Sequence, residues 1–185
     1  APQDMTVVCL SSTGALCSQT GSVYCDAEGP RCSWMFLPSG LVARHELHVI
    51  DLNVQGPHDA RARVAAIRQG LDRVQVGMPL SADRHFALVY CDGVSASEGF
   101  LMQAWYASAR FPCLAIGGSA GGALEWGKTF IGTRQGVLQH QAVVIFCEMA
   151  AGKSFAPFKS QNFEPTNKSW LVAQADPVSR TVSTV

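Results

Sequence analysis

The sequence predicts an α/β fold in which a mixed β-sheet is flanked by helices. Strand-like apolar runs alternate with helical segments along the chain, an order that is typical of α/β proteins. The clearest helical segment spans residues 57–76, where four apolar residues recur at spacings of three and four: Val64, Ile67, Leu71 and Val74. A hairpin around residues 133–136 joins two further strand-like runs, so we expect antiparallel strands beside parallel ones.

The predicted elements follow one another along the whole chain. We expect strands at 5–10, 33–37, 41–52, 86–91 and 112–116, hairpin strands at 129–131 and 137–148, and edge strands at 169–173 and 181–185. Helices are expected at 57–76, which opens at Pro57, and at 95–109, where Ser95 and Glu98 form a capping box. Because the chain opens almost directly on a strand and closes on another, we expect it to be a fragment of a longer protein.

Composition excludes several classes of protein. Of the 185 residues, 48% are apolar and 15% are charged, which excludes intrinsic disorder. The 14 basic and 14 acidic residues cancel, so the chain lacks the positive field of a nucleic-acid or membrane-surface binder. No apolar run approaches the roughly 18 to 20 residues that a membrane-spanning helix needs. Seven cysteines without a C-x-x-C pair predict a reducing, cytoplasmic location.

Two catalytic patterns overlap one glycine-rich segment. Residues Gly122–Thr129 match the P-loop pattern, but the residues after Lys128 favour a strand where that loop requires a helix. Residues Gly117–Gly121 match the G-x-S-x-G elbow of serine hydrolases, with Ser119 as the nucleophile. His140 is the histidine that follows it, and no acid lies between them at a workable separation. We therefore expect a protein that is not an enzyme, with an α/β serine hydrolase as the alternative.

Three turns that follow strand ends form the predicted ligand site. They contribute Ser12 and Gly14, then Asp92 and Gly93, and then Gly117, Gly118 and Ser119. If the strands are parallel, these turns gather at one edge of the sheet, where α/β folds usually bind ligands. Glycine permits close backbone approach, and the serine and aspartate side chains supply hydrogen bonds. A scaffold without a ligand is the remaining alternative.

Two histidines are candidates for ligating a haem iron. Strand alternation places His45 on one face with Leu47 and Val49, and His140 on one face with Ala142, so both are expected to point inward. The alternative for each is a core histidine that makes one hydrogen bond. His48, His58 and His85 are expected to be solvated.

The order of the motifs resembles the FIST sensory family. The resemblance rests on Val7–Gly14, Leu88–Gly93, Pro112–Gly121 and the run from Gly136 into Val144, and it covers nearly the whole chain. It implies an N-terminal FIST domain over residues 1–157, without its first βα unit. Residues 158–185 would then form the linker to, and the start of, a C-terminal FIST domain.

The resemblance also implies a function. FIST domains are regarded as small-ligand sensors for bacterial signal transduction, so a small molecule is the expected ligand. One branch with a similar linker binds haem and senses nitric oxide together with a histidine kinase. Haem is therefore a candidate cofactor, and a histidine kinase or a diguanylate cyclase or phosphodiesterase is a candidate partner. Nucleic acid and membrane are not expected as partners.

Overall fold

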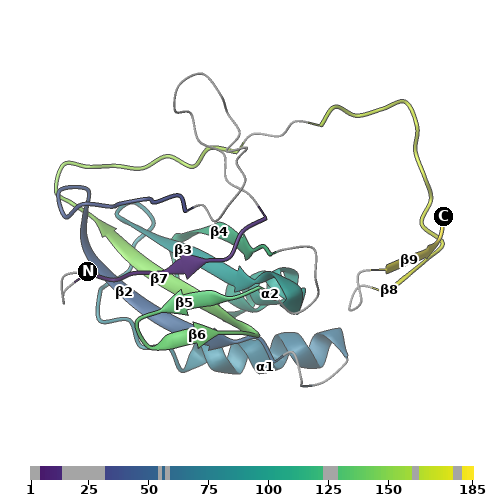
Figure 1. Ribbon diagram of the computed structural model, residues 1–185, viewed down its shortest axis with the longest axis horizontal. Coiled ribbons are helices and arrows are strands. Elements are labelled where there is room, and N and C mark those ends of the chain that lie inside the picture. Colours follow the sequence, from purple (N-terminus) through teal and green to yellow (C-terminus); the bar gives the residue numbers. More distant parts are fainter. Residues whose placement is uncertain are drawn as a thin grey trace.

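A central four-stranded sheet organises the protein. The computed structural model describes residues 5–13, 32–53, 56, 59–122, 129–159, 163–176 and 181–185. Its central sheet has the order β2-β7-β3-β4, formed by Val42–Asp51, Gln141–Met149, His85–Asp92 and Leu114–Ala120 (Figure 1). β7 is antiparallel to both of its neighbours, whereas β3 and β4 are parallel. The predicted α/β class with a mixed sheet is therefore confirmed.

Two helices cover one face of the central sheet. They are α1 (Ala60–Asp72), whose first turn is capped by Asp59, and α2 (Glu98–Ser108). Their buried side chains pack with the inward residues of the sheet: Ile67, Leu71, Leu101 and Trp105 from the helices, and Ala87, Val89 and Phe146 from the strands. The Trp105 and Phe146 rings are 5.8 Å apart and stacked, which places an aromatic contact in the middle of this core.

A small antiparallel sheet covers part of the other face. It has the order β1-β5-β6, formed by Cys9–Leu10, Ile131–Thr133 and Gly136–Leu138. Ile131 is fully buried against Val143 and Ile145 of β7, so the chain forms three layers in which helices and the small sheet enclose the central sheet. Within the described ranges, neither helix has the length and hydrophobicity needed to cross a bilayer.

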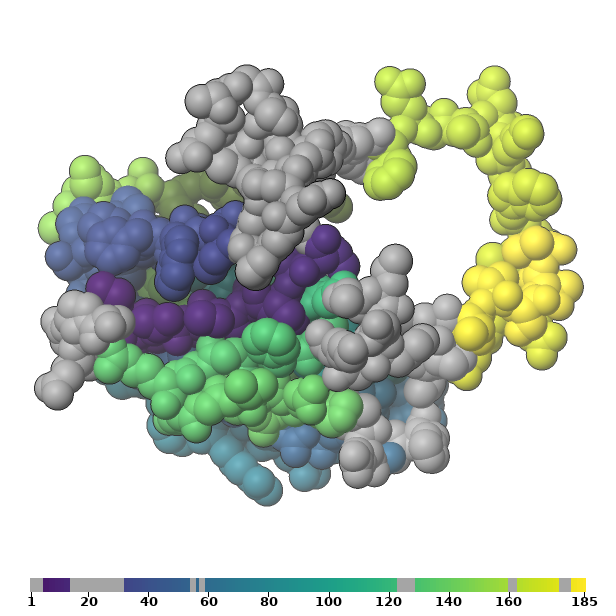
Figure 2. Space-filling view, viewed as in Figure 1, coloured from purple at the N-terminus to yellow at the C-terminus, as the bar shows by residue number. Residues whose placement is uncertain are grey.

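A hairpin of β8 (Gln174–Asp176) and β9 (Thr181–Thr184) follows near the end of the chain. All its described residues are exposed, and Figure 2 shows residues 181–185 outside the main body of the molecule. The strand expected at 169–173 is displaced to 174–176, and residues 33–37 are irregular. The N-terminal strand shortens to Cys9–Leu10, because pairing with β5 stabilises those two residues alone.

Two local predictions around β4 are wrong. Gly117–Ser119 lies inside β4, because parallel pairing with β3 continues as far as Asp92 and Ala120. Ser95 and Glu98 form no capping box: α2 begins after Ser97, the Ser95 hydroxyl donates to the Asp92 carbonyl, and Glu98 accepts a bond from Ser119. The Ser95 hydroxyl and the Glu98 carboxylate thus form their hydrogen bonds with residues near the carboxyl ends of β3 and β4.

Candidate functional site

Asp92 and Gly93 lie beside Ala120 and Gly121 at the carboxyl ends of β3 and β4, whereas Gly117–Ser119, predicted as a turn, is part of β4. Asp92 pairs with Ala120, and a Cβ added to Gly93 would lie only 2.1 Å from the Ala120 carbonyl oxygen. A Cβ added to Gly121 would lie 3.0 Å from the backbone nitrogen of Thr13. Glycine at position 93 therefore lets the strand ends approach each other more closely than any other residue would. Ser12 is exposed beside Thr13, and Gly14 lies outside the described residues.

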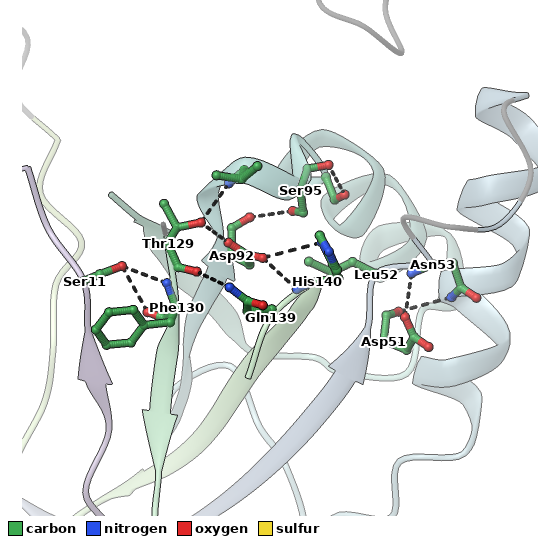
Figure 3. A network of polar contacts seen from close by, with 12 residues as sticks. Ser11, Asp51, Leu52, Asn53, Asp92, Ser95, Thr129, Phe130, Gln139 and His140 are labelled. Atoms are coloured by element: carbon green, nitrogen blue, oxygen red, sulfur yellow. Dashed lines mark hydrogen bonds and ion pairs between the residues drawn. The ribbon is translucent and has the colours of Figure 1, made fainter. Parts of the chain in front are cut away.

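Asp92 is the buried centre of a polar network at this edge (Figure 3). One carboxylate oxygen accepts a hydrogen bond from the Thr129 hydroxyl, and the other accepts the backbone N–H of His140 at 2.6 Å. Thr129 also accepts the backbone N–H of Val94 at 3.3 Å. Asp92 is only 2% exposed, and both of its carboxylate oxygens have donors. Through these donors it connects β3 to Thr129, just before β5, and to His140, just before β7. Its observed role is to position these segments.

Ser119 lies on the opposite face of the sheet from Asp92. It pairs with Cys91, and successive residues of a strand point to opposite faces. Its hydroxyl donates to the Glu98 carboxylate at the start of α2, and the residue is exposed at the free edge of β4. Gly117 and Gly118 are exposed on the same strand. A hydroxyl and a carboxylate are thus held together beside backbone that a ligand can approach.

The site carries negative charge. Burial, with smaller contributions from the nearby charges of Glu98 and Asp92, raises the pKa of the Cys91 thiol to about 12. The thiol is therefore protonated and chemically inert at neutral pH. A ligand group that carries a positive charge or several N–H donors is the best match for this potential.

Arg63 anchors the loop that carries this site. The residue is buried, and its guanidinium donates to the backbone oxygens of Ser95 at 3.1 Å and Leu52 at 3.3 Å. It also donates to the Ser97 hydroxyl and lies 5.0 Å from the centre of the Phe100 ring. α1 thereby fixes the segment between β3 and α2, so Glu98 is presented from a rigid support.

The geometry does not favour the two catalytic patterns. Ser119 bonds Glu98 on the helical face of the sheet, whereas His140 approaches Asp92 on the other face. Ser119, His140 and an acid therefore do not form a hydrolase triad. Thr129 of the P-loop pattern is followed by strand β5 rather than a helix. Residues 123–128 of that pattern lie outside the described residues.

The surroundings of His45 and His140 do not fit a haem. The expectation that His45 points inward is wrong, because the residue is exposed and its Nε2 lies 2.8 Å from Thr6 Oγ1. His140 lies in a bend before β7 with a φ of 58°, and its side chain is 45% exposed. Its backbone is held there by Asp92 and Leu52, so it does not join the strand. In the described part of the chain, a shallow groove of about 480 Å³ includes His48 but neither of these candidates.

The remaining histidines also differ from expectation. His85 is buried, and its Nδ1 accepts the backbone N–H of Ser81 at 3.1 Å. His48 is half-buried and packs edge-on against Phe146. Burial lowers the pKa of its imidazole, and Glu46 partly opposes that effect. His58 lies outside the described residues.

Sequence reasoning missed Thr129 and Glu98 as members of the site. Thr129 was assigned to the P-loop pattern and Glu98 to a helix cap, yet each bonds a predicted site residue. One signal pointed to Glu98, because an acid in the first turn of a helix after a strand-Asp-Gly turn lies near the carboxyl end of the sheet. Nothing in the sequence pairs Thr129 with Asp92, since 37 residues separate them.

Comparison with known proteins supports the family resemblance. A family model described as FIST N domain matches residues 1–184. Searches of curated proteins and of solved structures give no match. The match extends through residues 158–184, and the domain boundary expected at 158 stays a prediction. FIST domains are sensory domains of signal transduction. With the model matching almost every residue, the chain belongs to the FIST family.

Proposed function

We propose that this chain senses a small, positively charged ligand that binds at the carboxyl ends of β3 and β4. The observation that carries the proposal is the contact of the exposed Ser119 with the half-buried Glu98 near the end of the parallel strands. Open α/β sheets bind ligands outside the carboxyl ends of their strands, and here Ser119 is exposed near that end of β4.

The residues divide into two roles in this proposal. Ser119 and Glu98 contact the ligand: the carboxylate accepts N–H bonds from an ammonium group, and the hydroxyl, which donates its proton to Glu98, accepts a further one. Asp92 holds the strand ends in place from the opposite face. Gly117 lets β3 and β4 pair closely, because a Cβ there would lie 1.7 Å from the Val89 carbonyl oxygen, and Gly118 is exposed. The ligand is therefore a small primary amine or a related cation.

The downstream partner stays a prediction from the family resemblance. A histidine kinase, or a diguanylate cyclase or phosphodiesterase, would receive the signal in bacterial signal transduction. Haem-dependent sensing of nitric oxide is left out of the proposal, because the surroundings of His45 and His140 do not fit a haem.

A thermal-shift screen tests the proposal. Small primary amines and amino alcohols are compared with neutral polyols of matched size, each added to the full chain. A ligand present at about a hundred times its Kd stabilises the folded state by about 2.7 kcal/mol. For a domain of this size that corresponds to a rise in Tm of about 5 to 10 °C.

Matched variants assign the effect to the site. Glu98→Gln and Ser119→Ala should abolish the shift, whereas Gln103→Ala at an exposed position of α2 should retain it. Equal shifts from amines and polyols, or a full shift in Glu98→Gln, would show that the ligand binds elsewhere.

A further inference from the structure

Strand β2 presents an unpaired edge of the central sheet. In the order β2-β7-β3-β4, β2 lies at the end of the row, and among the described strands it pairs with β7 alone. The Leu52 N–H donates to the His140 carbonyl, so the backbone of Leu52 faces β7. Along an antiparallel ladder every second residue faces the same neighbour, and Leu47 and Val49 are an odd number of residues from Leu52. The N–H and C=O groups of Leu47 and Val49 must therefore point away from β7. They are free to pair with another strand.

The features that protect an edge are concentrated in the first half of β2. A register shift falls between Val42 and Arg44, and the charged Arg44 and Glu46 follow it. Bulges and charges of this kind prevent unwanted strand pairing. From Leu47 to Ile50 the edge carries neither, and it is regular in its pairing with β7. This half of the strand is suited to accept a further strand.

A groove runs beside this second half of β2. Its volume is about 480 Å³, and it lies between His48–Asp51 of the strand and the end of α1, from Gly70 to Gln75. Ile50 and Val74 give it apolar walls, and a Cβ added to Gly70 would still lie 3.9 Å from Ile50 Cγ2. Alternate side chains of an added strand would point into this space.

The groove also carries an available positive charge. Arg73 lines it and is exposed, and among the described residues no carboxylate lies within ion-pair distance of its guanidinium. Two acids belong to the groove and to the helix: Asp51 accepts the Asn53 N–H at 2.7 Å, and Asp72 lies 3.9 Å from Arg68. His48 beside it is kept neutral, since burial lowers the pKa of its imidazole. Asp51 keeps its charge while it accepts that bond, so the groove holds one charge of each sign, and a carboxylate is the complementary group at the Arg73 end alone.

We propose that the edge of β2 from Leu47 to Asp51 docks an extended peptide segment of a partner protein. The segment adds as a further strand, bonding the outward backbone groups of Leu47 and Val49. Its groove-facing side chains are apolar, except for one carboxylate that binds Arg73. This surface is separate from the Ser119–Glu98 site, which lies on β4 at the other edge of the sheet.

A designed peptide tests the docking surface. The probe is the fluorescently labelled peptide Thr-Val-Thr-Glu-Thr-Val-Thr, in which the valines and the glutamate share one face. Fluorescence anisotropy of the full chain with this probe should show saturable binding. Arg73→Glu should weaken it at least about tenfold, as expected for a lost hydrogen bond to a charged group. A probe with lysine in place of glutamate should then bind Arg73→Glu better than wild type.

Two controls separate strand addition from charge attraction. Arg68→Glu makes the same charge change on α1 outside the groove, and it should retain wild-type affinity. A probe methylated at alternate backbone nitrogens keeps its side chains but cannot complete the ladder, so it should not bind. Val49→Pro removes one outward N–H without removing a bond to β7 and should also abolish binding.

Three results would overturn the proposal. They are the absence of saturable binding to wild type, equal binding of the methylated probe, and equal losses in Arg73→Glu and Arg68→Glu. The methylated probe leaves the protein unchanged, so its result stands even if Val49→Pro does not fold.

Discussion

Removing the Asp92 carboxylate should destabilise the fold more than any surface change. Asp92→Ala leaves the Thr129 hydroxyl and the His140 N–H without their charged acceptor in a site that is 2% exposed at Asp92. Hydrogen bonds to a charged group contribute about 1.5 to 3 kcal/mol each, so the two together predict a loss of about 3 to 6 kcal/mol. A domain of this kind has a free energy of unfolding of about 5 to 15 kcal/mol.

The conservative substitution should cost less. The carbonyl oxygen of an asparagine at 92 can still accept the His140 N–H, and its amide can donate to Thr129 after the hydroxyl rotates. Asp92→Asn should therefore lose about 1 to 2 kcal/mol, mainly through the lost charge. The order Ala, then Asn, then wild type is the specific expectation.

Urea denaturation followed by tryptophan fluorescence measures these differences. Asp72→Asn, which alters an exposed pair with Arg68, is the matched control and should change the free energy of unfolding by less than about 1 kcal/mol. A double-mutant cycle of Asp92→Asn with Thr129→Val should reveal coupling, because the two side chains share a bond. If Asp92→Ala unfolds within about 1 kcal/mol of wild type, the network does not hold the strand ends.

Three further predictions follow from local geometry. Gly117→Ala should lower the free energy of unfolding by about 1 to 3 kcal/mol, as is typical of overpacking, because its Cβ would lie 1.7 Å from the Val89 carbonyl oxygen. An unchanged midpoint of urea denaturation would contradict this. Burial lowers the pKa of His48 in the folded state, so the unfolded chain binds more protons as the pH falls below 6.5, and the free energy of unfolding should fall with the pH. His48→Gln should flatten this dependence of the free energy of unfolding between about pH 7 and 5. An equal dependence in wild type and variant would argue against it. With its pKa at about 12, Cys91 should stay unlabelled by iodoacetamide at about pH 8 while the exposed Cys9 is modified, as read by mass spectrometry; rapid labelling of Cys91 would show that its site opens.

The parts of the fold that the sequence predicted are those set by local periodicity. The apolar face of α1 and the continuous apolar run of β7 each follow from spacing within a short segment, and both elements were found. The strand at β3 was expected at 86–91 and is observed at His85–Asp92. In these segments the residues that pack together lie close in the sequence, so the pattern alone identifies the element.

The misplaced residues are those whose position depends on distant partners. Gly117 and Gly118 have little intrinsic preference for a strand, and they adopt one because β3 supplies the pairing. His140 matches a strand pattern but turns out of it, because its backbone bonds Asp92 and Leu52 instead. His85 was expected to be solvated, yet Ser81 binds its ring and the fold buries it.

The register of β3 and β4 explains why the candidate site has two sides. Placing Gly93 and Gly121 at one edge required only that β3 and β4 be parallel, which the sequence could suggest. Whether Ser119 and Asp92 face the same way depends on the pairing of Asp92 with Ala120, which no local pattern contains. Because they face opposite ways, Asp92 acts on the stability of the strand ends, whereas Ser119 and Glu98 lie on the face of the proposed ligand. Substituting Asp92 therefore tests the scaffold, and substituting Glu98 tests recognition, so the two experiments can fail independently.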